Sequence, residues 1–174
     1  MGNNVKVLIP ETELVNKIKE MAEQINKDYN GEALHLICIL KGSVFFTCEL
    51  AKYLTMPVTM DFMAVSSYKN ALKSSGVIEI TKDLDPSDPI EGKNVLVIED
   101  IIDSGNTLSW LLNNLSKRNP KSLKLCTLLD KPARRETPVE VDYTGFEVPD
   151  LFVVGFGLDA AQKYRNFPYI AVIE

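Results

Sequence analysis

One stretch of thirteen residues, from Val95 to Thr107, combines side chains that could bind phosphate, sugar hydroxyls and a metal ion. It contains an apolar strand, the adjacent carboxylates Glu99 and Asp100, two more apolar residues, and the polar loop Asp103–Thr107. Carboxylates are poor phosphate ligands, but they accept hydrogen bonds from vicinal sugar hydroxyls and, together with water, coordinate Mg²⁺. The pattern therefore predicts a sugar and metal site beside a strand.

The polar loop leads into a predicted helix that begins near Thr107 and ends near Arg118. A helix N-terminus presents unpaired N–H groups and the positive end of the helix dipole, and Gly105 lets the backbone approach a ligand closely. The hydroxyls of Ser104 and Thr107 add two donors. The whole stretch therefore fits a ligand with a ribose diol, a phosphate at one end and a metal-bound diphosphate. It lacks the Gly-Lys-Ser or Gly-Lys-Thr ending of a P-loop, which argues against a nucleoside triphosphatase.

Strand-like and helical segments alternate along the chain, as they do in α/β domains. The continuous apolar runs at Leu34–Leu40 and Val95–Ile98 are typical of parallel strands covered on both faces. We therefore expect one domain over residues 1–174, with a central, mostly parallel twisted sheet flanked by helices. The expected strands are Val5–Pro10, Leu34–Leu40, Val58–Ser66, Val77–Thr81, Val95–Ile98, Ser122–Leu129, Leu151–Phe156 and Tyr169–Ile173. The expected helices are Glu13–Asn26, with Thr12 as its N-cap, Val44–Leu54 and Thr107–Arg118.

Composition narrows the function further. The 174 residues carry a net charge of -5, which argues against nucleic-acid binding because that usually needs a basic face. No apolar run approaches the roughly 20 residues needed to span a bilayer, and the N-terminus lacks the features of a secretory signal. Three cysteines without a CxxC spacing and a single histidine argue against a zinc site or a redox role. We therefore expect a cytoplasmic protein with small-molecule partners and no membrane association.

The Val95–Thr107 pattern closely resembles the 5-phosphoribosyl-1-diphosphate signature of the type I phosphoribosyltransferases. Further segments narrow the resemblance to the hypoxanthine-guanine phosphoribosyltransferases and extend it over nearly the whole chain. These segments are Leu40-Lys41-Gly42, Ser67-Tyr68, Asp130-Lys131, Val148–Asp159 and Lys163–Asn166. Lys131 and the segment around Phe152 separate this family from the orotate and adenine transferases. The resemblance implies the type I fold, with a small hood over the active site.

The resemblance also implies which residues bind the phosphoribosyl donor. Glu99 and Asp100 would hold the ribose hydroxyls and Mg²⁺, which is the implied cofactor. The residues that would surround the 5′-phosphate are Asp103, Ser104, Gly105, Asn106 and Thr107. Lys41, Gly42 and Arg165 would bind pyrophosphate, and the family pattern places a cis peptide bond before the lysine. Ser67 and Tyr68, at the start of a polar segment that ends at Gly76, would close over the reacting centre as a lid.

A second implied set of residues binds the purine base. Asp103 would act as the general base near N7, and Lys131 would donate to the exocyclic O6. Phe152 would stack on the purine, and the backbone of Val153 would meet its pyrimidine edge. Asp159 would contact a second metal ion or the purine 2-position. Together these roles imply a purine salvage transferase that makes IMP or GMP, and the family resemblance suggests a homo-dimer or homo-tetramer.

Two departures from the family pattern leave the preferred base open. Ser104 replaces the threonine of many family members, although it still supplies a hydroxyl, and Ala160 stands where an aromatic residue often follows Asp159. The order of preference among hypoxanthine, guanine and xanthine is therefore undecided. Outside these positions, we interpret the pairs Lys117-Arg118 and Arg134-Arg135 as solvated charges.

Two alternative functions remain at this point. One is a regulatory relative that keeps the fold and the phosphoribosyl site but binds RNA; the acidic charge balance, Lys131 and the Phe152 segment favour the enzyme instead. The other is a different phosphoribosyltransferase that uses xanthine and guanine, or a pyrimidine. Assays with a panel of free bases discriminate between the enzymes, and RNA binding at physiological salt tests the regulator.

Overall fold

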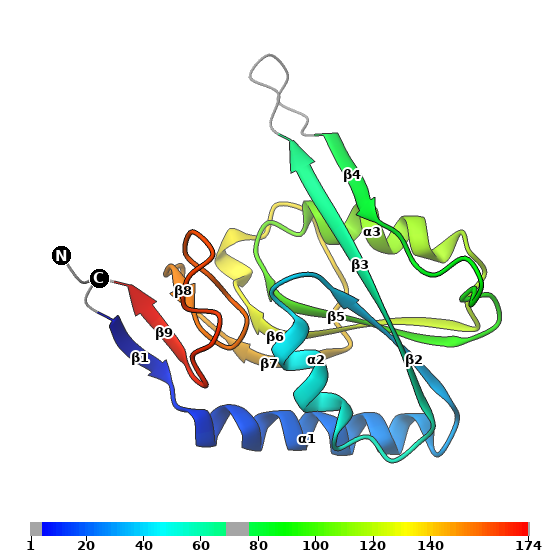
Figure 1. The fold of residues 1–174 in the computed structure, drawn as a ribbon, viewed down its shortest axis with the longest axis horizontal. Helices are drawn as coiled ribbons and strands as arrows, with labels where there is room; N and C mark the ends of the chain where they lie inside the picture. Colours follow the sequence, from blue (N-terminus) through cyan, green and yellow to red (C-terminus); the bar gives the residue numbers. More distant parts are fainter. Residues whose placement is uncertain (1–4, 69–76, 174) are drawn as a thin grey trace.

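The computed structural model describes residues 5–68 and 77–173, and its centre is a sheet of six strands in the order β4-β3-β2-β5-β6-β7 (Figure 1). The strands are β2 (Leu34–Ile39), β3 (Val58–Tyr68), β4 (Val77–Lys82), β5 (Asn94–Ile102), β6 (Ser122–Asp130) and β7 (Tyr143–Glu147). Neighbouring strands from β3 to β7 pair in parallel, and only β4 is antiparallel to its neighbour β3. The prediction of a mostly parallel central sheet is confirmed.

Helices cover both faces of this sheet, which explains the continuous apolar runs. α1 (Glu11–Tyr29) and α2 (Val44–Ala51) lie on one face, and α3 (Asn106–Ser116) lies on the other (Figure 1). All six residues of β2 are buried, and they alternate between the two cores. Leu36 packs in the core that includes α1 and α2, whereas Ile37 packs in the core that includes α3. A strand covered on both faces has no polar side, as its sequence indicates.

The first helix begins earlier than its sequence pattern predicts. Thr12 is not the N-cap, because α1 starts at Glu11 directly after Pro10, which has an extended backbone with φ -64°. Pro10 occupies the N-cap position, where its carbonyl oxygen accepts the backbone N–H of Leu14 at 3.0 Å, and its ring offers no polar atom with which to cap the helix. The helix ends at Tyr29, three residues beyond the predicted Asn26, where Asn30 adopts a left-handed conformation with φ 46°.

A second, antiparallel sheet has the order β1-β9-β8 and joins the two ends of the chain. It consists of β1 (Val5–Ile9), β8 (Val153–Val154) and β9 (Ile170–Ile173), and it lies beside the central sheet (Figure 1). The predicted strand Leu151–Phe156 is reduced to two residues, because the chain turns sharply at Gly155, Phe156 and Gly157, which all have positive φ. The turn after β8 returns the chain toward the loop that follows β2.

Four local features differ from the sequence-based expectations. β5 continues to Ile102 rather than ending at Ile98, because β6 continues to pair with it beyond that point. β7 and the short 3-10 helix η1 (Pro132–Arg134) were not predicted. β3 includes Ser67 and Tyr68, so these two residues belong to a strand rather than to a loop. None of the helices within the described ranges is long and apolar enough to cross a bilayer.

The single histidine lies inside the sheet. His35 in β2 is 2% exposed, and its Nδ1 lies 2.8 Å from Oγ1 of Thr59 in the neighbouring strand β3. Its Nε2 is buried and has no hydrogen-bond partner among the residues that the structure describes. Burial lowers the pKa of His35, and the positive charge of Lys93 lowers it further. The fold therefore holds this imidazole in its neutral form.

We predict that His35 makes the protein sensitive to mild acid. A lowered pKa means that the stability the neutral ring contributes is fully present above the ordinary histidine value of 6.5 and is lost as the pH falls through the folded-state pKa. The free energy of unfolding should therefore decrease more steeply for the wild-type protein than for His35→Gln between about pH 7.5 and about pH 5. Urea unfolding measured across this range checks the prediction. Parallel curves for the two proteins would contradict it.

Candidate active site

Two adjacent carboxylates lie in the last part of β5. Glu99 and Asp100 are partly exposed, and Oε1 of Glu99 accepts the backbone N–H of Asp100 at 3.1 Å. Burial raises the pKa of Glu99 well above its ordinary value, and the charge of Asp100 adds to this effect. Burial also raises the pKa of Asp100. A cation or hydroxyl donors bound next to this pair would lower the free-energy cost of holding two negative charges close together.

The donor set of this pair fits Mg²⁺. Carboxylate oxygens are the hard ligands that this ion prefers, and Mg²⁺ commonly binds one or two carboxylates and takes its other ligands from water and substrate phosphates. Within residues 5–68 and 77–173, no group of three or more His, Cys, Asp or Glu side chains could hold a metal ion together. Asp159 therefore does not join the pair in one cluster. Its Oδ1 lies 2.7 Å from Nη2 of Arg165, and its Oδ2 accepts the backbone N–H of Gln162.

The predicted phosphate loop surrounds a small hollow at the start of α3. The hollow has a volume of about 150 Å³. It is lined by Glu99, Ile101, Ile102, Asp103, Ser104, Gly105, Thr107 and Leu108. α3 begins at Asn106, one residue from the predicted start, and Gly105 precedes it with φ 83°. The hollow thus lies at a helix N-terminus, where backbone N–H groups and the helix dipole favour an anion.

A neighbouring segment holds this loop in place. The backbone N–H groups of Glu136 and Thr137 donate to the carbonyl oxygen of Ser104 at 2.9 and 3.0 Å. Asn106 donates from its side chain to Glu136 at 2.8 Å and accepts from the hydroxyl of Thr137. A Cβ at Gly105 would lie 2.5 Å from the carbonyl oxygen of Thr137, so only glycine fits. The side chain of Asn106 therefore supports the loop instead of facing the hollow.

Two loops, one after β2 and one after β8, approach each other beside Asp100 at Gly42 and Gly157. The Leu40–Lys41 peptide bond is cis, as predicted, and Lys41 is exposed. A Cβ at Gly42 would lie 1.6 Å from Oδ2 of Asp100. A Cβ at Gly157, where φ is 101°, would lie 1.9 Å from the carbonyl oxygen of Gly42. The loop after β2 therefore lies against the Asp100 side chain of β5, and its backbone contacts the turn after β8.

Arg165 joins this meeting point. Its Nη1 donates to the carbonyl oxygen of Gly157 at 2.6 Å, while its Nη2 forms the ion pair with Asp159. The charge of Arg165 lowers the pKa of Asp100, against the larger effect of burial. The structure thus brings together four of the predicted donor-binding residues, and Asp159, predicted to contact a second metal ion or the purine 2-position, joins them through Arg165. The four are Gly42, Glu99, Asp100 and Arg165.

Lys131, the predicted O6 donor, directly follows the carboxyl end of β6. Lys131 is 8% exposed, and its backbone N–H donates to the carbonyl oxygen of Ile102, which lies next to Asp103. Phe152 is 61% exposed, so a face of its ring is open for stacking, and the adjacent Val153 is buried in β8. The backbone of Lys131 is therefore bonded to the residue before Asp103, and the roles of the two side chains stay predictions.

The interpretation as solvated charges is wrong for Arg135, whereas Arg134 is exposed, as predicted, and also forms an ion pair. Arg135 forms an ion pair with Asp130, in which the side chains are only 17% and 14% exposed. Nε of Arg134 lies 2.9 Å from Oδ1 of Asp103. Pro132 begins the three-residue helix η1, in which the backbone N–H of Arg134 donates to the carbonyl oxygen of Lys131 at 3.0 Å.

The predicted lid residues lie on the β3–β4 hairpin. Ser67 is exposed and pairs with Ile78 of β4, and the backbone of Tyr68 pairs with Val77. These strands extend beyond the rest of the central sheet (Figure 1). The remainder of the predicted segment, residues 69–76, lies outside the described residues, and the lid role stays a prediction.

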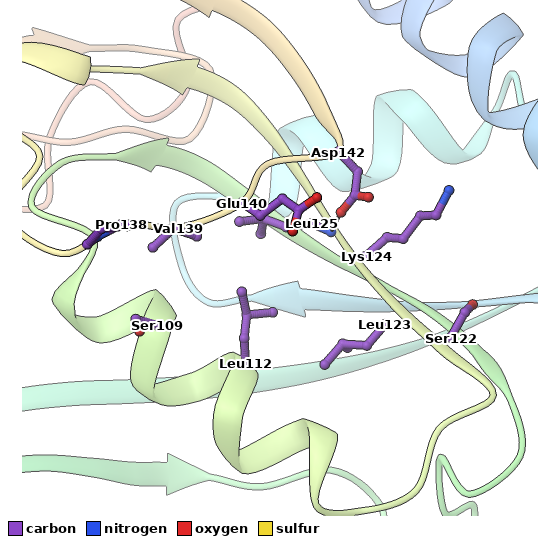
Figure 2. Close-up of a pocket in the computed structure, with 10 residues that line it drawn as sticks. All are labelled: Ser109, Leu112, Ser122, Leu123, Lys124, Leu125, Pro138, Val139, Glu140 and Asp142. Atoms are coloured by element: carbon purple, nitrogen blue, oxygen red, sulfur yellow. Dashed lines mark hydrogen bonds between the residues drawn. The ribbon is translucent and has the colours of Figure 1, made fainter.

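A larger hollow of about 450 Å³ lies elsewhere, between α3, β6 and the segment before β7 (Figure 2). Its charged lining residues are Lys124, Glu140 and Asp142, and Asp142 accepts the backbone N–H of Leu125 at 2.8 Å. None of the predicted site residues lines it. The smaller hollow beside the carboxylate pair is therefore the better candidate for phosphate chemistry.

Comparison with known proteins gives a consistent result. The family model of the phosphoribosyl transferase domain matches residues 9–161. The chain is 50% identical, over its full length, to the bifunctional protein TilS/HprT of Listeria monocytogenes, of which it spans only 27%. It is 49% identical to the hypoxanthine-guanine phosphoribosyltransferase of Bacillus subtilis, with 97% of this chain and 93% of the relative covered.

A solved structure shows the same fold. The crystal structure of a hypoxanthine-guanine phosphoribosyltransferase from Bacillus anthracis matches with a TM-score of 0.93 and 46% identity. The match covers 99% of this chain and 100% of that one.

We predict that the contact between Gly157 and Gly42 is critical for stability. Gly157→Ala combines an unfavourable positive φ with a Cβ that has no room, whereas Gly92→Ala has a positive φ of 71° and nothing within 4 Å of the new Cβ. In Gly92→Ala, backbone strain alone should lower the free energy of unfolding by about 1 kcal/mol. Gly157→Ala should cost about 1–3 kcal/mol more. Thermal or urea unfolding measures the difference, and equal losses would mean that the loops separate without cost.

Proposed function

The chain belongs to the phosphoribosyltransferase family, and on that premise we propose that it transfers the 5-phosphoribosyl group of 5-phosphoribosyl-1-diphosphate to a 6-oxopurine. The bond between the ribose C1′ and the diphosphate oxygen breaks, and its electron pair leaves with pyrophosphate. A ring nitrogen of the purine forms the new bond to C1′, and the purine proton passes to the enzyme. Hypoxanthine gives IMP and guanine gives GMP, which makes the reaction a purine salvage step. Xanthine is a third base to test.

The observation that carries this proposal is the meeting of three features at the carboxyl end of β5. The carboxylate pair, the hollow at the start of α3 and the Lys41-Gly42 loop lie together there. The pair suits a ribose diol, the hollow suits the 5′-phosphate, and the loop suits the diphosphate. These are the three parts of the proposed donor.

Cationic residues on the donor side of the site would stabilise the pyrophosphate as it leaves. Lys41 is exposed next to Gly42, and we assign it to the pyrophosphate together with Arg165. Mg²⁺, held by Glu99 and Asp100, would neutralise charge on the diphosphate when bound, and Asp159 would contact a second metal ion or the purine 2-position. Arg165 is paired with Asp159 in this structure, so donor binding would have to share or redirect that guanidinium. Ser67 and Tyr68 are assigned to a lid that excludes water from the reacting carbon.

Base recognition falls to the residues around β6 and β8. Lys131 would donate to O6, Asp103 would accept the proton at N7, and Phe152 would stack on the ring while the Val153 backbone meets its pyrimidine edge. Adenine carries an amino donor in place of O6, so it would leave the buried Lys131 ammonium unmatched. This mismatch is the proposed basis for selecting oxopurines.

The setting of the enzyme is also proposed. We propose that residues 1–174 act as one phosphoribosyltransferase domain in the cytoplasm, as a homo-dimer or homo-tetramer, without nucleic-acid or membrane partners. Cys38, Cys48 and Cys126 are all free, which suits a reducing compartment. Size-exclusion chromatography with light scattering tests the oligomeric state.

Nucleotide formation from a panel of bases tests the reaction itself. Hypoxanthine, guanine, xanthine and adenine are each supplied with 5-phosphoribosyl-1-diphosphate and Mg²⁺. Monophosphate and pyrophosphate should appear with hypoxanthine and guanine but not with adenine. Folded protein that binds the donor yet makes no product with any base would contradict the transferase and favour the RNA-binding alternative.

The role of Asp103 predicts a selective kinetic defect. Asp103→Asn removes the proton acceptor while keeping the shape of the side chain, so nucleotide formation should slow by about 100-fold or more. Donor affinity should remain within about two-fold, because the amide still fits the loop. Single-turnover rates and calorimetric donor binding measure the two effects separately. A wild-type rate in the variant would remove Asp103 from the chemistry.

The role of Lys131 predicts a change in selectivity. Lys131→Ala removes the donor to O6, so the ratio of kcat/KM for hypoxanthine to that for adenine should fall by about 10-fold or more. The two bases are compared under identical donor concentrations. An unchanged ratio would place base selection at other residues.

A further inference from the structure

Four charged side chains of alternating sign form a row beside the proposed base site. Oδ1 of Asp103 lies 2.9 Å from Nε of Arg134, and Nη1 of Arg134 donates to Oδ2 of Asp150 at 3.4 Å. Oδ1 of Asp150 in turn lies 4.0 Å from Nζ of Lys131. The row begins at the proposed general base and ends at the proposed O6 donor. Arg134 and Asp150, its inner members, belong to neither assigned role.

Backbone hydrogen bonds around η1 fix the position of the Arg134 main chain. Its N–H donates to the carbonyl oxygen of Lys131 at 3.0 Å, which closes the short 3-10 turn. Lys131 is itself tied to β5 by its bond to Ile102, and Nε of Arg135 donates to the carbonyl oxygen of Asp103 at 3.3 Å. The turn is therefore attached to the end of β5 from both sides. This leaves the Arg134 guanidinium directed at the Asp103 carboxylate.

Exposure indicates that this row does little for stability. The side chains of Asp103, Arg134 and Asp150 are 49%, 51% and 54% exposed. Ion pairs between such exposed groups typically contribute only about 0–1 kcal/mol to folding. The Arg134 guanidinium is planar and rigid, and it binds Asp103 through Nε and Asp150 through Nη1. Its contribution is therefore to position these two carboxylates. It holds Asp103 and Asp150 at a fixed separation.

The chemistry of the base explains why that separation matters. O6 and N7 are neighbours on one edge of a 6-oxopurine, so a single base must meet Lys131 and Asp103 at the same time. Resting on the proposed function, we propose that Arg134 is a positioning residue that sets the spacing between the proton acceptor and the O6 donor. It binds Asp103 through Oδ1, so that Oδ2 accepts the purine proton. It acts on Lys131 through Asp150.

The test uses the full-length protein with three substitutions, Arg134→Gln, Arg134→Lys and the matched control Arg118→Gln. Arg118 also binds an aspartate, Asp83, at 2.7 and 3.1 Å, but it lies at the end of α3 outside the proposed site. For hypoxanthine, kcat/KM should fall about 10- to 100-fold in Arg134→Gln, as expected for a misplaced catalytic group. Donor affinity should stay within about two-fold and Tm within about 2 °C. Arg118→Gln should match the wild type.

Arg134→Lys separates positioning from charge. An ammonium is a point charge and cannot hold two carboxylates along one plane, so this variant should recover little of the lost activity. Full recovery would overturn the positioning role, as would an Arg134→Gln variant that behaves like Arg118→Gln. A loss of donor affinity equal to the loss of kcat/KM would also overturn it, because the defect would then be a general collapse of the site.

Asp150→Asn tests the second half of the row. If Arg134 acts on Lys131 through Asp150, the double variant Arg134→Gln/Asp150→Asn should be about as active as Arg134→Gln alone, since the two changes interrupt one connection. Multiplied defects would overturn that connection. Failure of the proposed function is distinguishable, because the wild-type protein would then make no nucleotide with any base. Failure of this inference alone leaves a wild-type protein that is active and an Arg134→Gln variant that is equally active.

Discussion

Placing the carboxylates of Glu99 and Asp100 side by side at the end of β5 costs free energy, because partly buried negative charges lose hydration and repel each other. The raised pKa of each carboxyl group expresses this cost. The surrounding structure is arranged so that a ligand can reduce it. The loop after β2 approaches Asp100 so closely that only Gly42 fits, and the hollow at the start of α3 opens next to Glu99. A donor carrying a diol, a phosphate and a metal-bound diphosphate supplies the missing partners.

The two sides of the site are built by different kinds of interaction. On the donor side, backbone segments touch at Gly105 and Gly157 and Gly42 lies against the Asp100 carboxylate, so close packing that only glycine allows sets the geometry. On the base side, ion pairs connect Asp103, Arg134, Asp150 and Lys131. Close-packed backbone responds little to salt or pH, whereas exposed ion pairs respond to both. The base side is therefore the more adjustable part of the site, which suits the part that distinguishes one base from another.

Sequence patterns predicted those parts of the molecule that depend on local chemistry. The buried strands β2 and β5 were recognisable because strands covered on both faces have continuous apolar sequences. The phosphate loop was recognisable because an apolar strand, two carboxylates and a Gly-containing polar loop follow one another in the single stretch Val95–Thr107. β7 was missed because Tyr143 is its only buried residue, so no apolar pattern marks it. The ion pair of Arg134 was missed because it depends on the direction of a three-residue turn and on Asp103, which lies 31 positions earlier.

Donor binding measured with and without Mg²⁺ tests most directly whether the carboxylate pair is the centre of the site. Calorimetry is performed with 5-phosphoribosyl-1-diphosphate on the wild-type protein, on Glu99→Gln/Asp100→Asn, and on Glu140→Gln as a carboxylate control from the other hollow (Figure 2). We expect Mg²⁺ to tighten donor binding by the wild type and the control. The double variant should bind about 10-fold or more weakly and should not respond to Mg²⁺, because it loses charged hydrogen-bond acceptors. Wild-type affinity and Mg²⁺ dependence in the double variant would contradict the assignment of the donor to this pair.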